Sequence, residues 1–140
     1  MRPIMIKKIA LVVWGITSLT ACSSMFGTSF DKPSHLLFQQ KNADSLVIQI
    51  KRDNKLCQGD HLKDQKCPIK FYIDDLKAGD FYVNNKTKYY LSPNDYVLKV
   101  KNCAVDCFVS DLKITLNSSK NNMTYILSLD DSNKPYIIQQ

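Results

Sequence analysis

The sequence predicts an all-β fold, a small antiparallel β-sandwich of about seven strands, and three observations support this. Short runs of alternating apolar and polar residues recur over 45–140, separated by residues typical of turns. After position 22, no window of about 11 residues shows a helical period. All 13 acidic residues are aspartates, which favour turns over helices.

The first strand, 45–51, shows the pattern clearly, because Leu46, Ile48 and Ile50 share one face whereas Gln49 lies on the other. Further strands are expected at 69–73, 76–78, 81–83, 88–91, 96–101, 112–116, 123–129 and 136–138. Turns or bends are expected at 74–75, 79–80, 84–86, 92–95, 118–122 and 130–133, which are rich in Asp, Asn, Gly, Ser and Pro.

The first 22 residues have the layout of an export signal. Basic residues at positions 2, 7 and 8 precede an uncharged, mostly apolar run of 11 residues, which is too short for a membrane-spanning helix of about 20 residues. The tetrapeptide Leu19-Thr20-Ala21-Cys22 follows. Together these features resemble the signal peptides of bacterial lipoproteins. The alternative is an ordinary signal peptide that is cleaved near Ala21.

The lipoprotein resemblance implies a lipid anchor. The signal helix, 1–21, would be removed, and Cys22 would carry a diacylglyceryl group on its thiol and an acyl chain on its amino terminus. Because each buried methylene contributes about 0.8 kcal/mol, several chains hold a protein firmly on a membrane. Ser23 and Ser24 stand where lipoproteins of the inner membrane carry Asp, which implies the outer membrane of a Gram-negative bacterium.

Residues 22–44 are then expected to form a flexible tether, and 45–140 the β-sandwich domain. A flexible segment of about 20 residues spans roughly 25 Å on average. The apolar run 35–38 within this tether is expected to pack against the domain.

The charge is mild once the export signal is removed, because its three basic residues account for half of the formal net charge of +6. The remaining lysines are scattered, whereas a nucleic-acid partner requires a clustered basic patch with stacking aromatics. Lys99, Lys101 and Lys113 are expected on one sheet face. That face is either solvated or a contact for glycan phosphates or an acidic protein.

The cysteines other than Cys22 predict disulfides, since an even number in a small exported domain is typical of disulfide bonding. There are four of them: Cys57, Cys67, Cys103 and Cys107. Their spacings, Cys-x9-Cys and Cys-x3-Cys, do not match the short pairs of zinc ribbons. We therefore expect two disulfides, with no metal and no other cofactor.

Residues 69–101 resemble the PEGA-like domains of bacterial surface proteins. The matching stretches are 71–75 (Phe-Tyr-Ile-Asp-Asp), 76–79 and 90–100. Asp75 and Asn94 stand where the pattern has Gly, and both residue types adopt positive φ more readily than most. The wider chain is similar to small envelope lipoproteins with this core. The resemblance implies a compact PEGA-like, Ig-like or transthyretin-like sandwich without implying an activity.

This resemblance also implies a disulfide pairing. If the strand that follows Cys67 pairs antiparallel with the strand that precedes Cys103, these two cysteines come together and Cys57 is left to meet Cys107. In the alternative, each cysteine pairs with its neighbour in the sequence.

The two histidines, His35 and His61, have no neighbouring nucleophile in the sequence. A weak metal site of His61 with Asp60 and Asp64 is conceivable, but a solvated loop is the simpler interpretation. No metal or catalytic role is therefore assigned to either histidine.

The paired aspartates permit an enzymatic interpretation. Two carboxylates among Asp74, Asp75 and Asp80 would suit glycoside hydrolysis. Turn chemistry explains these residues better, and it also explains Asp130 and Asp131. We expect turns and no catalytic residue.

The sequence therefore predicts a lipid-anchored, non-enzymatic protein of the cell envelope that binds or supports another envelope component. One alternative is an inhibitor or exclusion factor that blocks an enzyme or a receptor through loop 52–68, and another is an enzyme acting on cell-wall glycan. Tyrosines gathered on one face would form a recognition surface. The tyrosines are Tyr72, Tyr82, Tyr89, Tyr90, Tyr96, Tyr125 and Tyr136.

Overall fold

The computed structural model describes residues 29–140, so Cys22 and the predicted signal peptide lie outside the described residues. The strands, in chain order, are β1 Leu46–Arg52, β2 Ile69–Ile73, β3 Leu76–Phe81, β4 Lys86–Leu91, β5 Asn94–Cys103, β6 Cys107–Leu116, β7 Met123–Leu129 and β8 Pro135–Gln139. A single 3-10 turn, η1 Ser118–Lys120, precedes β7.

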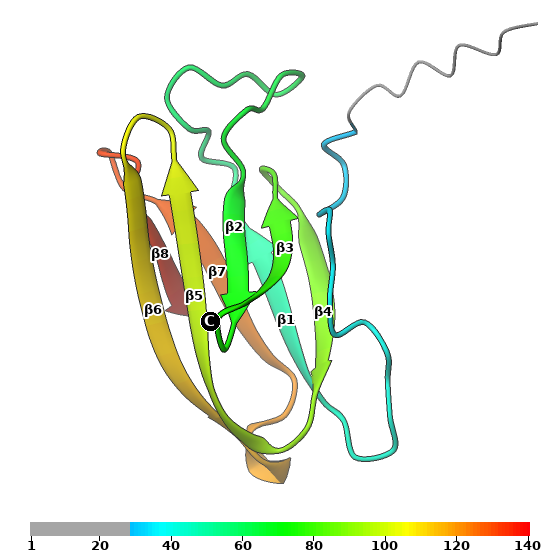
Figure 1. The fold of residues 1–140 in the computed structure, drawn as a ribbon. Coiled ribbons are helices and arrows are strands. Elements are labelled where there is room, and N and C mark those ends of the chain that lie inside the picture. Colours follow the sequence, from blue (N-terminus) through cyan, green and yellow to red (C-terminus); the bar gives the residue numbers. More distant parts are fainter. Residues whose placement is uncertain (1–28) are drawn as a thin grey trace, which may run out of the picture.

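These strands form two four-stranded sheets that pack face to face (Figure 1). One sheet has the order β4-β1-β7-β8 and the other the order β3-β2-β5-β6. The predicted all-β sandwich is therefore confirmed. One pair departs from the antiparallel pattern, because β1 and β7 run parallel, with Ile48 beside Met123 and Arg52 beside Leu127.

Two strands have the predicted bounds, β2 and β7, whereas β5 and β6 are longer than expected. They pair along all ten residues, from Asn94 opposite Leu116 to Cys103 opposite Cys107. The bend expected at 79–80 is wrong, because both residues lie inside β3 and are paired with β2.

The core lies between the sheets and follows the alternation within each strand. Its fully buried side chains include Tyr89, Phe71, Phe81, Ile48, Ile50, Ile69, Leu98, Val100 and Leu127. The rings of Phe71 and Phe81 pack edge to face at 5.9 Å. The Tyr89 hydroxyl donates a hydrogen bond to the Ala78 carbonyl oxygen at 2.8 Å. This bond joins the two sheets, because Tyr89 belongs to β4 and Ala78 to β3.

Within residues 29–44, the described part of the predicted tether, residues 34–37 lie along the edge of β3 (Figure 1). Ser34 and Asp80 exchange two backbone hydrogen bonds, with N···O distances of 3.1 and 2.9 Å. The Leu37 N–H donates to the Ala78 carbonyl at 3.2 Å. The backbone of this part of the segment therefore pairs with a sheet edge.

The same segment continues onto β4. The Tyr90 N–H donates to the Phe38 carbonyl at 2.9 Å, and the Gln39 side chain donates to the Lys88 carbonyl at 3.0 Å. Leu36 and Phe38 pack against the core, as predicted for the run 35–38. One segment thus covers the outer edges of β3 and β4.

Candidate functional site

Three segments meet at one end of the sandwich, which we call the loop end: loop 53–68, the β5–β6 turn at 104–106 and the β7–β8 turn at 130–134 (Figure 1). The Gln58 N–H donates to the side-chain oxygen of Asn133 at 3.0 Å. The two loops are thereby held together.

Arg52 ends β1 beneath this loop and is almost fully buried. Its guanidinium donates to the Phe81 carbonyl at 2.7 Å and to the Lys55 carbonyl at 3.2 Å. Burial lowers the pKa of Arg52 to about 10, although the negative charges of Asp53 and Asp60 act in the opposite direction. The buried cation thus fastens the beginning of the loop to the end of β3.

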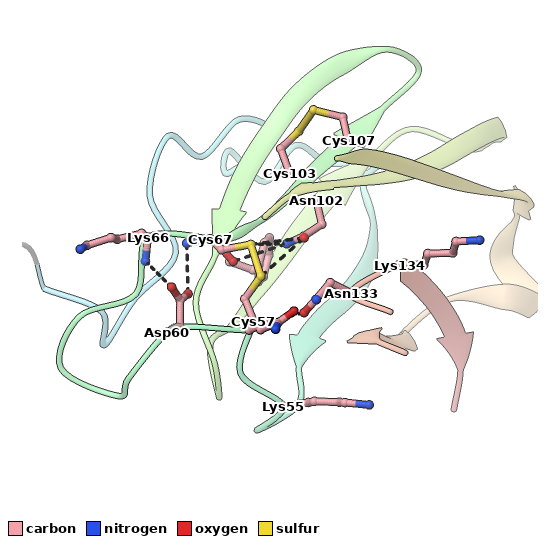
Figure 2. Close-up of a disulfide and its surroundings, with 12 residues drawn as sticks. Lys55, Cys57, Asp60, Lys66, Cys67, Asn102, Cys103, Cys107, Asn133 and Lys134 are labelled. Carbon is pink, nitrogen blue, oxygen red and sulfur yellow. Dashed lines mark hydrogen bonds between the residues drawn. A yellow bond between two sulfur atoms is a disulfide. The ribbon is translucent and has the colours of Figure 1, made fainter. Parts of the chain in front are cut away.

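The first disulfide joins Cys57 to Cys67 and is buried in the core (Figure 2). Its two Cα atoms are 6.0 Å apart. Beneath it lies Asn102, which is fully buried. The Asn102 amide nitrogen lies 2.9 Å from the Cys67 sulfur and 3.5 Å from the Cys67 carbonyl oxygen. The loop is therefore anchored at both cysteines to the end of β5.

The second disulfide joins Cys103 to Cys107, across the last residue pair of the β5–β6 ladder, with Cα atoms 4.1 Å apart. Two disulfides are thus confirmed, but the pairing of Cys67 with Cys103 and Cys57 with Cys107 is wrong. The strands do pair antiparallel as that pairing required. Since side chains alternate along β5, however, Asn102 points inward to Cys67 and Cys103 points to the opposite face.

Asp60 joins the middle of loop 53–68 to the end of the same loop. Its two carboxylate oxygens accept hydrogen bonds from the N–H groups of Lys66 and Cys67, at 3.0 and 3.1 Å (Figure 2). His61 and Asp64 contact each other through their backbones. The conceivable metal site is therefore not assembled, because the Asp60 carboxylate faces backbone donors.

The surface of the loop end carries two of the exposed apolar side chains of residues 29–140, Leu62 and Val105, which are 63% and 89% exposed. Val105 stands at the tip of the β5–β6 turn, beside a shallow cavity of about 160 Å³ that Gln58 and Asn133 also line. Both side chains are therefore presented by loops that disulfides and hydrogen bonds hold in place.

The described chain begins beside this same end. The rings of Phe30 and Tyr82 are 4.8 Å apart, and the Asn85 side chain donates to the Phe30 carbonyl at 2.7 Å. Phe30, Leu62 and Asn85 line one cavity of about 290 Å³. The first described residues therefore lie at the loop end.

The aspartates at 74–75 form the predicted turn between β2 and β3, with positive φ values of 47° and 64°. Asp74 accepts a hydrogen bond from the Val97 N–H at 2.8 Å, and Asp75 forms an ion pair with Lys99. Asn94, the other residue at a Gly position of the PEGA-like pattern, instead begins β5. Asp74 also lines a groove of about 330 Å³ with Asp95, but the Asp95 carboxylate accepts from the Thr115 hydroxyl at 2.6 Å.

Asp80 is a buried strand residue and not a turn residue. One of its carboxylate oxygens lies 3.0 Å from His35 Nδ1 and 2.8 Å from Lys77 Nζ. His35 thus has a carboxylate partner that only the tertiary fold supplies. Its effect is to fasten residue 35 to β3. At the other turn, Asp130 accepts from two backbone N–H groups of residues 132 and 134, as turn chemistry predicts.

The three lysines do share the outer face of their sheet, because Lys99 faces Asp111 and Lys113 faces Val97 across the β5–β6 ladder, with Lys101 in phase. The face is of mixed charge. The tyrosines do not all gather on one face: Tyr89 and Tyr125 are buried, and Tyr72 and Tyr136 lie on different sheets. Tyr90 and Tyr96, however, line one cavity of about 360 Å³.

The sequence analysis missed the structural roles of three polar residues that build the loop end: Arg52, Asn102 and Asp60. For Asn102 the signal was present, because Tyr96, Leu98 and Val100 set a phase that continues to position 102. Arg52 likewise continues the phase of Ile48 and Ile50. For Asp60 no sequence signal exists, since its partners depend on how the loop closes.

Comparison of the chain with protein-family models, curated proteins and solved structures finds no match. Among residues 29–140 there is no helix long and apolar enough to cross a membrane.

Proposed function

We propose that this protein is a lipid-anchored, non-enzymatic component of the outer membrane that faces the periplasm and binds another envelope protein through its loop end. The observation that carries this proposal is the exposure of Leu62 and Val105 on loops that two disulfides brace. Apolar side chains held rigidly in solvent lose little conformational entropy on binding and suit a recognition surface.

The length of chain between anchor and domain supports this choice of surface. Seven residues lead from Cys22 to Ser29, and even a fully extended chain of that length spans only about 25 Å. The contacts of residues 29–40 with β3 and β4 leave no further slack in the tether. A lipid on Cys22 would therefore keep the loop end close to the membrane, and we expect the partner to be associated with that membrane.

The use of the carboxylates supports a binding role over catalysis. Asp60, Asp74 and Asp95 each accept hydrogen bonds from backbone N–H groups or from a hydroxyl. Each of these bonds fixes a loop, a turn or a strand pair, so a structural role accounts for all three carboxylates.

Photo-crosslinking in living cells tests the proposal. A photoreactive side chain is placed at position 62 or 105, and recovered partners are identified by mass spectrometry. Leu76 and Ile138 provide matched controls, because they are also exposed apolar residues, 55% and 47%, but lie away from the loop end. The same four variants are repeated with Cys22→Ser.

One dominant protein captured from positions 62 and 105, absent from positions 76 and 138 and lost with Cys22→Ser, is the expected result. Equal capture from all four positions would contradict a specific loop end. A partner that persists with Cys22→Ser would show that the anchor does not bring the two together.

The inhibitor alternative is favoured by one observation, the position of Leu62 between two pinned cysteines. In that case the loop itself would enter an enzyme or a receptor. Replacing residues 58–66 by a short Gly-Ser linker, with Cys57 and Cys67 retained, should abolish inhibition but leave capture from position 105 intact. Loss of both would assign the whole loop end to one interface.

A further inference from the structure

The four outer edges of the two sheets differ in whether another segment covers them. Residues 29–40 cover the edges of β3 and β4, as described above. On the opposite side, no segment among residues 29–140 pairs with the outer side of β6 or β8. Figure 1 shows β6 at the margin of its sheet, with β8 behind it.

The β6 edge is long and regular. It is ten residues in length, without proline, and paired with β5 from end to end. Every second residue therefore turns an N–H and a C=O outward, away from β5. The β8 edge is only five residues long and begins with Pro135. Of the two, β6 is the edge able to accept a further strand.

The outward-facing side chains of β6 carry two opposite charges close together. Asp111 and Lys113 are both exposed, and neither has a charged partner within 4.0 Å among the described residues. Val109, on the same face, is 54% exposed. An additional strand would therefore meet a negative and a positive charge two residues apart.

A second β6 strand satisfies this pattern in one antiparallel register. When Leu112 faces Leu112 of a second copy, Asp111 faces Lys113 at two symmetry-related positions, and Val109 faces Thr115. Shifting the register by one pair places Asp111 opposite Asp111, or Lys113 opposite Lys113. Like charges directly opposite each other destabilise a ladder, whereas opposite charges stabilise it. The charges thus select one register.

We propose that two copies of this chain associate through β6, in the register that centres on Leu112, to form a continuous eight-stranded sheet. The occupant of the free edge is then a second copy of the chain, and the interface is the same strand on both sides, as two-fold symmetry requires. The inference is independent of the lipid anchor and of the loop end, which belongs to other segments.

Cysteine crosslinking of the full chain tests the register. In Leu112→Cys the two introduced thiols face each other across the two-fold axis, so a disulfide-linked dimer is expected on a non-reducing gel. Ser110→Cys is the matched control, because residue 110 lies on the same strand and the same face but would meet residue 114 of the other copy. It should give little dimer.

Exchanging the charges at positions 111 and 113 tests whether they determine the register of the dimer. In the Leu112→Cys background, Lys113→Asp places Asp opposite Asp twice and should weaken dimer formation about tenfold. Lys113 faces Val97 within its own chain, so this change introduces no like-charge pair with β5. Adding Asp111→Lys exchanges the two charges and should restore the dimer relative to Asp111→Lys alone, because both of these chains carry the same like-charge pair with Lys99 of β5.

Equal crosslinking of Ser110→Cys and Leu112→Cys, or no recovery in the charge-exchanged double variant, would overturn the proposal. Absence of crosslinked dimer in a Leu112→Cys chain that unfolds with a normal transition would do so as well. If Leu112→Cys does not fold, sedimentation of the unmodified chain against Lys113→Asp decides: a monomer at all concentrations in both refutes the dimer.

Discussion

The two disulfides of the loop end differ in their surroundings and in the length of chain that they close, with sequence separations of 10 and 4 residues. The Cys57–Cys67 bridge is buried and rests on Asn102, so it forms part of the core. The Cys103–Cys107 bridge lies at the tip of a hairpin whose ladder already aligns its two strands. The first therefore holds a long irregular loop to the sandwich, and the second stiffens a turn that presents Val105.

Removing each bridge separates these two roles. Replacing Cys57 and Cys67 by Ala should lower the free energy of unfolding by about 3–5 kcal/mol, because loop constraint and core packing are lost together. Replacing Cys103 and Cys107 by Ala should cost about 1–2 kcal/mol, since the β5–β6 ladder remains. Urea unfolding of the two double variants measures the difference. Equal losses would show that the surface bridge carries as much of the fold as the buried one.

The residue beneath the buried bridge should matter next. Asn102→Ala removes the donor to the Cys67 carbonyl and leaves a small cavity, so a loss of about 1–3 kcal/mol is expected. Asn133→Gly is the surface counterpart, because it also removes one contact to the loop while accepting the positive φ of 61° at this position, and about 0.5–1.5 kcal/mol is expected. A larger loss of unfolding free energy for the variant at Asn133 than for Asn102→Ala would contradict the prediction that Asn102 contributes more to holding the loop.

Loop closure within the buried bridge depends on Asp60. Asp60→Asn keeps the shape but turns an amide NH2 toward one of two backbone N–H groups, so we expect about 1–2 kcal/mol of destabilisation. Limited proteolysis should then cut within 58–66 sooner than in the unmodified protein. Asp64→Asn is the control, since its exposed ion pair with Lys66, at 3.4 Å, contributes little.

The smallest effect on stability is expected where the largest effect on binding is predicted. Val105→Asp changes an exposed side chain, so the free energy of unfolding should stay within about 0.5 kcal/mol of the unmodified value. Capture of the partner from position 62 should nevertheless be lost. Unchanged capture would exclude the β5–β6 turn from the interface.

The sequence predicted the sandwich well because alternation is a local property. The strands at 69–73 and 123–129 have the expected bounds, and Asp75 has a positive φ as expected, whereas Asn94 does not and lies in β5. The parallel pairing of β1 with β7 was not predicted, since it depends on which strands become neighbours and not on any pattern within either of them.

The sequence predicted the components of the candidate site but not the contacts between them. Loop 52–68 and its cysteines were recognised, but their pairing was not, although the phase of β5 already placed Asn102 inward and Cys103 outward. The contacts of residues 29–40 were missed for a different reason. Backbone pairing with a sheet edge, as between Ser34 and Asp80, leaves no periodic trace in the side chains.

The connectivity of the disulfides also bears on how the protein is made. The four cysteines of the described domain are bonded in consecutive pairs, Cys57 with Cys67 and Cys103 with Cys107. In a chain delivered amino end first into an oxidising compartment, joining thiols in their order of appearance yields the native bonds at once. A lipid on the sulfur of Cys22 would remove the one earlier thiol from this sequence. Oxidative maturation should therefore need an oxidant but no exchange of bonds by a disulfide isomerase.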